Sequence, residues 1–161
     1  MDALDAIKKR QSVRKYTGAA VPKDDLEKIV NAGRLAATGS NKQPWVFIVI
    51  TKKSVIKRLS KAANWSENSG AMIAVVMDPS SKYWIEDGSA AIENMLIAAT
   101  ALGYGTCWLQ GNIRPHEPEF KLLLNIPQNQ NLLAIITVGV PLEWPTKEKK
   151  PLDEVLHWEN F

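Results

Sequence analysis

The sequence contains little cysteine and little histidine. Cys107 is its one cysteine, so no disulfide can form within the chain. The two histidines, His116 and His157, do not combine with Cys107 in a spacing typical of a metal site. We therefore expect a fold without disulfides and a function that uses no bound metal ion.

Long apolar runs are also missing. No stretch reaches the roughly 18 consecutive apolar residues that a membrane-spanning helix needs. The first residues carry the acids Asp2 and Asp5 where a secretory leader would be basic, and no leader-like apolar segment follows. These absences predict a cytoplasmic protein without membrane contact.

The common nucleotide and nucleophile motifs are absent. Neither G-x-x-x-x-G-K-[ST] nor G-x-G-x-x-G occurs, and Gly103-Tyr104-Gly105 lacks the third glycine of the second motif. No serine or cysteine has a plausible histidine and acid beside it. If the chain is an enzyme, a cofactor should supply its chemistry. A net charge of +3 is far from the dense basic stripe of a nucleic-acid-binding module, which is a poorly supported alternative.

The pattern of apolar residues predicts one domain. The chain has 161 residues, and at 45% apolar composition it can form a substantial core. Helices expected from 3.6-residue periodicity alternate with strongly apolar strands, which predicts a three-layer arrangement with helices on both faces of a sheet. The expected helices cover residues 2–10, 22–39, 53–63, 89–102 and 115–124, and the expected strands cover 46–50, 72–77, 106–109 and 132–140.

Three of these elements carry specific expectations. Asp2 should cap the first helix, with Leu4 and Ile7 facing inward. The continuous apolar run at 46–50 predicts a strand buried on both faces. The helix at 89–102 is apolar nearly all round, so a chain of this size needs a partner subunit to cover it.

Arg10, Ser12 and Arg14 lie at alternate positions after the first expected helix. On an extended segment this spacing points all three in the same direction. Guanidinium groups suit phosphates and electron-rich carbonyl edges, so the three could form a cradle for a phosphate joined to a heterocycle. The alternative interpretation is a solvated basic segment, since Lys8, Lys9 and Lys15 lie nearby.

Three further stretches have two interpretations each. Asn41 and Gln43 offer amides to the edge of a polar ring, or belong to an ordinary turn that begins at Gly39. The stretch from Trp108 to Asn112 has a glycine that would let backbone approach a flat ring, or is a turn at a strand end. The basic residues 147–150 add cations to a phosphate site, or form a solvated tail.

Taken together, these stretches resemble the nitroreductase family of FMN-dependent oxidoreductases. The resemblance runs through nearly the whole chain and rests on four segments in order: 7–16 (IKKRQSVRKY), 40–45 (SNKQPW), 98–108 (AATALGYGTCW) and 147–155 (KEKKPLDEV). It implies an α+β fold of three layers (α/β/α) with a mixed, mainly antiparallel sheet, in an intertwined homodimer. The whole chain, residues 1–161, would be one FMN-binding domain whose C-terminal extension, residues 141–161, packs on the partner subunit.

The resemblance also implies roles for individual residues. Arg10 and Ser12, with Gln11 between them, would bind the FMN phosphate and ribityl chain, and Arg14 would face the N1–C2=O side of the flavin. The remaining implied cofactor-binding residues are Lys147 and Lys149 at the phosphate, Asn41 and Gln43 at the ring, Gln110 and Gly111 near N5 with Trp108 and Leu109 before them, and Ala37, Thr38 and Ser40 at the FMN of the other subunit.

The implied activity is a ping-pong transfer of hydride from NADH or NADPH through FMN to a small flat acceptor such as a nitroaromatic or a quinone. No side chain would be catalytic by itself; Arg14 and Gln110 would tune the flavin. The alternative is an FMN-binding protein with little reductase activity: a carrier, a sensor or a specialised flavin-using protein.

The sequence departs from the family pattern at several points. Ala37-Thr38 stands where proline and serine are frequent, and Lys149 stands where arginine is frequent. The segment between Met77 and Ser89 is short, which predicts a more open pocket, and Asn64 matches a ring-contacting asparagine of longer members only loosely.

Overall fold

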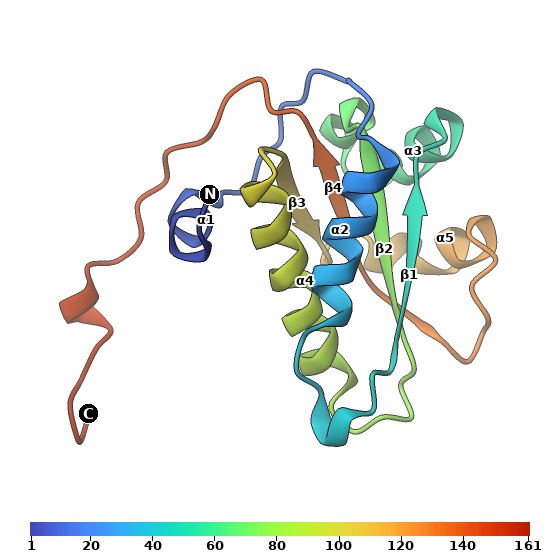
Figure 1. Ribbon diagram of the computed structural model, residues 1–161. Helices are drawn as coiled ribbons and strands as arrows, with labels where there is room; N and C mark the ends of the chain where they lie inside the picture. The colour runs from blue at the N-terminus through green and yellow to red at the C-terminus, as the bar shows by residue number, and fades with distance from the viewer.

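A computed structural model describes all residues, 1–161, of the chain. The chain forms five α-helices and four β-strands, and short 3-10 turns lie between several of them (Figure 1). The helices and strands are α1 (Ala3–Lys9), α2 (Lys23–Arg34), β1 (Trp45–Ile50), α3 (Lys53–Leu59), β2 (Ala71–Met77), α4 (Trp84–Ala101), β3 (Gly105–Leu109), α5 (Glu117–Leu123) and β4 (Asn131–Gly139). The 3-10 turns are η1 (Gly39–Asn41), η2 (Ser60–Ala62), η3 (Asn64–Asn68), η4 (Arg114–His116) and η5 (Leu152–Glu154).

The four strands form one antiparallel sheet in the order β1-β2-β4-β3. In the register of the central pair, Ile73 lies opposite Ile136. The parallel pairing in the structure is an isolated bridge between Ser12 and Thr106, beside the β3 edge. The expected mainly antiparallel sheet and the α+β class are therefore confirmed.

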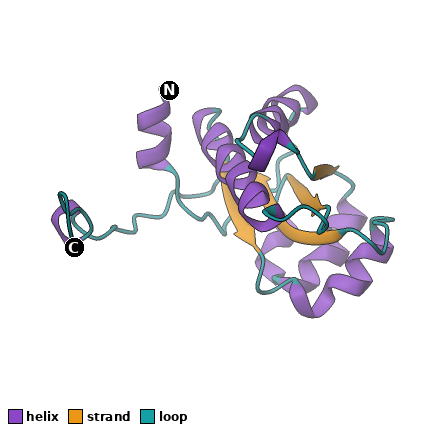
Figure 2. Cartoon of the chain, turned by 90° about the horizontal axis from the view of Figure 1, so that it is seen from below, coloured by secondary structure: helices purple, strands orange, loops and turns teal.

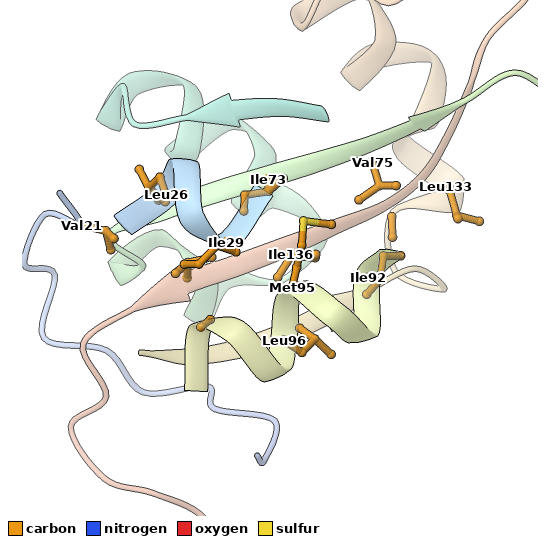
Figure 3. Packing of buried hydrophobic residues seen from close by; sticks show 14 of the residues in the cluster. Val21, Leu26, Ile29, Ile73, Val75, Ile92, Met95, Leu96, Leu133 and Ile136 are labelled. Atoms are coloured by element: carbon orange, nitrogen blue, oxygen red, sulfur yellow. The ribbon is translucent and has the colours of Figure 1, made fainter. Parts of the chain in front are cut away.

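Helices cover both faces of the sheet, which gives the expected three layers. In Figure 1, α2 and α4 lie in front of the sheet, whereas α3 and α5 lie on its other side, and Figure 2 shows the strands between the two groups of helices. Each face has its own core of buried apolar residues. Figure 3 shows the core under α2 and α4, which includes Leu26, Ile29, Ile73, Met95 and Ile136.

The first strand corrects one expectation. The side chains of Val46 and Val49 on β1 are 58% and 41% exposed, so this strand is not buried on both faces. The physical reason is its position, because β1 is an edge strand that pairs only with β2. An apolar run does not reveal whether a strand lies at the centre of a sheet or at its edge.

Two helix boundaries also differ from the expectation. The second helix ends at Arg34, so Ala37 is exposed in the connection that follows it instead of lying on a buried helix face. The helix expected from residue 89 begins at Trp84. Ile97 and Ala98 on that helix are only half-buried, so part of its apolar surface stays uncovered within one chain.

Most of the C-terminal arm, defined as residues 141–161, extends away from the body of the domain (Figures 1 and 2), whereas α1 packs against α4. Asp2 caps α1 as expected, with its carboxylate accepting a hydrogen bond from Asp5 N at 2.9 Å. The expected inward packing of Leu4 and Ile7 is wrong for the single chain, since they are 68% and 52% exposed. Ala6 is the buried residue of this helix.

The extended segment after α1 is anchored to the sheet by Tyr16. Its buried hydroxyl donates to Val13 O at 2.7 Å and also forms a hydrogen bond of 2.7 Å with the Thr137 hydroxyl in β4. Burial raises the pKa of the Tyr16 phenol. The folded state therefore depends on a protonated Tyr16.

Replacing Tyr16 with phenylalanine should lower the free energy of unfolding by about 1–2 kcal/mol, because the buried Val13 O and Thr137 Oγ1 both lose their hydrogen bond to the Tyr16 hydroxyl. Since the folded protein holds the phenol proton more tightly than the unfolded chain, wild-type stability should fall as the pH rises above about 10, and less so in the variant. Urea unfolding at several pH values measures both effects. Tyr83→Phe, at a residue that is 46% exposed, is the matched control; equal urea midpoints for the two variants would contradict the prediction.

Candidate functional site

A pocket of about 480 Å³ opens beside the end of β3. Its wall combines the end of this strand, the turn that follows it, one side chain from the N-terminal segment and one from η3. The lining residues are Arg14, Trp65, Cys107, Trp108, Leu109, Gln110, Gly111 and Asn112. Five of the residues expected to bind a cofactor therefore meet here: Arg14, Trp108, Leu109, Gln110 and Gly111.

Backbone pairing with β3 brings the N-terminal basic segment to this pocket. Val13 N donates to Thr106 O at 2.8 Å, next to the bridge between Ser12 and Thr106. Arg14 Nη1 donates to Ser12 O at 3.3 Å, and the Arg14 guanidinium lies 5.8 Å from the centre of the Trp65 ring. The expected extended conformation of this segment is what carries Arg14 to the pocket.

The thiol of Cys107 reports on the electrostatics of the pocket wall. Burial raises the pKa of Cys107, while Arg14, Ser12 and Arg10 act in the opposite direction more weakly. Arg10, Ser12 and Arg14 therefore all lie close enough to Cys107 to influence its thiol, but only Arg14 of the three lines the pocket. At neutral pH the thiol stays protonated, and the positive charge of Arg14 is available to a ligand.

The start of the C-terminal arm lies against the same N-terminal segment. Gln11 Nε2 donates to Lys147 O at 3.1 Å, and the Lys9 ammonium lies 4.7 Å from the centre of the Trp144 ring. Lys149 is exposed two residues farther along the arm. Residues separated by 136 positions thus share one basic region.

Arg10 in this region is held by α4. Its Nε lies 3.2 Å from Glu93 Oε1, and the Arg10 side chain is only 18% exposed. Glu93 engages the Nε edge of the guanidinium, which leaves the two terminal nitrogens for another acceptor.

The turn after β3 is held in place but leaves open space. Asn112 Nδ2 donates to Ala62 O at 3.3 Å, and the buried Ile113 donates its N–H to Gln110 O at 3.2 Å. A Cβ atom added to Gly111 would meet nothing within 4 Å. The fold itself does not require glycine there, so the free space is available to a flat ligand.

The other predicted cofactor residues lie elsewhere in the single chain. Ala37, Thr38, Ser40, Asn41 and Gln43 belong to the connection between α2 and β1, and none of them lines the pocket beside β3. Three of them have left-handed backbone conformations, with φ of 53° at Ser40, 55° at Asn41 and 52° at Gln43. Such conformations in residues other than glycine cost about 1 kcal/mol or more each and concentrate at functional positions.

Asp87 holds this strained connection. Its carboxylate is buried near the start of α4, and Oδ1 accepts a hydrogen bond from Gly39 N at 2.9 Å. The other oxygen, Oδ2, is buried without a partner. Sequence reasoning missed Asp87 because nothing near it in the chain connects it with Gly39.

Sequence reasoning also missed three residues of the pocket wall: Trp65, Cys107 and Asn112. It had considered Asn64, which is exposed and does not line the pocket. One signal was present, because Trp65 is a large aromatic residue within the polar stretch of residues 64–68. An aromatic residue in such a short polar turn has no apolar periodicity to explain it.

The structure contains neither a cluster of metal ligands nor a helix that could span a membrane. Nowhere do three or more histidine, cysteine, aspartate or glutamate side chains cluster in a way that could bind a metal ion. No helix combines the length and the apolar character needed to cross a membrane.

The structure defines an α+β domain with an open pocket, lined in part by Arg14, beside one edge of its sheet. The chain belongs to the nitroreductase family, whose profile matches residues 7–81 and 66–140. The resemblance inferred from the four sequence segments is thereby confirmed.

Individual relatives agree with this assignment. A protein of Archaeoglobus fulgidus named as a candidate NADH dehydrogenase/NAD(P)H nitroreductase is 38% identical over 151 residues, covering 87% of this chain and 86% of the relative. The solved structure of an FMN-dependent nitroreductase from Clostridium difficile superposes with a TM-score of 0.89 at 27% identity, covering 98% and 99% of the two chains. A candidate nitroreductase from Desulfovibrio desulfuricans, solved in complex with FMN, has a TM-score of 0.86 at 29% identity and covers 98% of its length and all of this chain.

Proposed function

We propose that this protein is an FMN-dependent oxidoreductase that takes electrons from NADH or NADPH and passes them to a small flat acceptor. The observation that carries the proposal is the pocket beside β3, where Arg14 meets the Gln110-Gly111 turn, with Ser12 and Arg10 just before Arg14 on the segment that pairs with β3. The FMN complex of the Desulfovibrio desulfuricans relative supports the choice of cofactor.

The donors available in this region suit FMN. The two terminal nitrogens of Arg10 are proposed to bind the phosphate, assisted by Gln11, Ser12 and the lysines Lys147 and Lys149. Guanidinium groups bind phosphate in a bidentate geometry that an ammonium group cannot provide. The open space at Gly111 supports close approach of a flat ring to the backbone.

The pocket wall favours chemistry carried by a cofactor. Its lining contains no histidine, aspartate or glutamate that could serve as a general acid or base. When bound, FMN supplies the hydride acceptor and donor that these side chains do not provide. The proposed role of Arg14 is to hold a positive charge beside the electron-rich edge of the ring, and Gln110 and Gly111, which follow Trp108 and Leu109, are proposed to contact the ring from the turn.

We further propose that the functional unit is a homodimer. The C-terminal arm exposes large apolar side chains, including Trp158 at 78% and Leu152 at 70%, which a second chain could cover. The half-buried part of α4 supports the same arrangement. In this dimer, the connection that contains Ala37, Thr38, Ser40, Asn41 and Gln43 would complete the pocket of the partner.

An absorption spectrum of the purified protein, followed by anaerobic titration with NADH and with NADPH, tests the proposal. We expect a yellow protein that binds FMN and loses its visible absorbance when the preferred nicotinamide is added. Failure to bind FMN after reconstitution would overturn the proposal. Bound FMN that neither nicotinamide reduces would instead favour a flavin carrier or sensor. Addition of a nitroaromatic or a quinone to the reduced protein then tests the acceptor class by the return of absorbance.

A further inference from the structure

We propose that Trp65 is a positioning residue that holds the Arg14 guanidinium at the pocket, and that its ring thereby sets how strongly the site favours FMN in its reduced, negatively charged state. This inference rests on the proposed function and deepens it. Its basis is the contact between the two side chains, with the guanidinium carbon 5.8 Å from the centre of the indole ring, in the wall of the pocket beside β3.

Trp65 stands on a firmly held segment. The neighbouring Ser66 is fully buried, and its hydroxyl donates its one hydrogen to Ala63 O at 2.7 Å or to Ser60 Oγ at 3.0 Å. The Ser60 hydroxyl donates in turn to Ile56 O in α3 at 2.9 Å. These bonds link η3 to the end of α3 and hold the backbone that carries Trp65, whose side chain also packs against the buried core on this face of the sheet.

The same segment is linked to the turn that follows β3. The hydrogen bond from Asn112 to Ala62 joins η2 to the residues next to Gln110 and Gly111. Trp65 and this turn therefore belong to one connected wall of the pocket. A side chain held by Trp65 is held relative to the whole pocket.

Arg14, in contrast, has few other restraints. It is exposed, forms no ion pair, and makes one side-chain hydrogen bond, the 3.3 Å contact with Ser12 O. A long arginine side chain without partners samples many rotamers. The Trp65 ring limits these rotamers through the attraction between the cation and the face of the ring.

The side chain that holds each arginine determines how much of its positive charge is available to a ligand. Arg10 is paired with the carboxylate of Glu93, which offsets part of its positive charge. An indole ring carries no net charge, so it orients Arg14 and leaves the full positive charge in the pocket. This is the arrangement needed to stabilise negative charge that appears on a ligand only after reduction.

Three variants test the proposal: Trp65→Leu removes the aromatic face, Trp65→Phe keeps a smaller one, and Trp65→Leu combined with Arg14→Gln tests whether the effect passes through Arg14. For each we would measure the FMN dissociation constant and the two-electron midpoint potential of the bound FMN, with urea unfolding as a check on folding. In Trp65→Leu the preference for reduced over oxidised FMN should fall about fivefold. This corresponds to a midpoint potential lower by about 20 mV, because a tenfold change is about 30 mV for two electrons.

Trp65→Phe should lie between wild type and Trp65→Leu, and Trp65→Leu should add no further shift when Arg14 is already glutamine. An equal shift with and without Arg14 would overturn the proposal, since Trp65 would then act on the cofactor directly. Unchanged potentials in folded variants that bind FMN would overturn it as well. If the wild type binds no FMN, the proposed function fails first and this inference fails with it, so the two failures are distinguishable.

Discussion

Arg14→Ala should weaken FMN binding by about tenfold or more and slow the reduction of bound FMN by NADH or NADPH. The expectation follows from the removal of a charged hydrogen-bond donor, a loss of about 1.5–3 kcal/mol in typical cases. The slower reduction follows from the lost positive charge, because reduction places negative charge on the ring that Arg14 is proposed to face. Fluorescence titration with FMN and anaerobic stopped-flow absorbance measure the two effects.

Two further variants make this test specific. Arg14→Lys keeps the charge but loses the planar guanidinium, so it should fall between wild type and Arg14→Ala. Arg58→Ala removes an exposed arginine of α3 and should change neither quantity. Wild-type affinity and reduction rate in Arg14→Ala would refute the assigned role of Arg14 and, with it, the main support for the proposed site.

A chain that ends at Trp144 should behave as a monomer and lose most of its FMN. The shortened chain loses the hydrogen bond from Gln11 to Lys147 O but keeps two other contacts with the N-terminal segment, Leu142 N to Lys15 O at 3.0 Å and the ion pair of Lys15 with Glu143 at 2.7 Å. It lacks the exposed apolar side chains of residues 152–161, which are proposed to pack on the second chain. Light scattering coupled to size-exclusion chromatography gives the mass, and the ratio of visible to ultraviolet absorbance gives the bound FMN.

The truncation also removes Lys147 and Lys149. A control must therefore separate the effect of losing these two charges on FMN binding from the effect of losing the dimer. The full-length variant with Lys147→Ala and Lys149→Ala should remain dimeric and bind FMN more weakly, since only the phosphate contacts are lost. A shortened chain that stays dimeric would show that the arm is dispensable for assembly. One that becomes monomeric but retains FMN would show that a single chain forms the complete site.

The fold could be predicted largely from the periodicity of apolar residues. The amphipathic pattern of α2 and the apolar runs of β2 and β4 are local signals, and the structure bears out each of these elements. The exposed β1 face and the exposed Leu4 and Ile7 could not be predicted in the same way. A sequence shows that a residue is apolar but not whether its own chain or another chain covers it.

The site was predictable where its residues are close in sequence. The alternating spacing of Arg10, Ser12 and Arg14 pointed to a shared direction, and the family resemblance supplied the link to Gln110-Gly111. The contact of Gln11 with the Lys147 backbone and the cation–π contact of Arg14 with Trp65 join distant segments. Such contacts depend on strand order and on turn geometry, which no local pattern encodes.

The open edge of β1 has a consequence for how the chain reaches its native state. A newly made chain presents unpaired backbone groups along this strand, next to the exposed Val46 and Val49, and an arm that ends in apolar residues. Exposed strand edges of this kind favour adhesion to other unfinished chains. If a second copy covers these surfaces, association is the last step of folding. The rate at which two chains meet would then determine which fraction of the chains becomes native protein and which fraction aggregates.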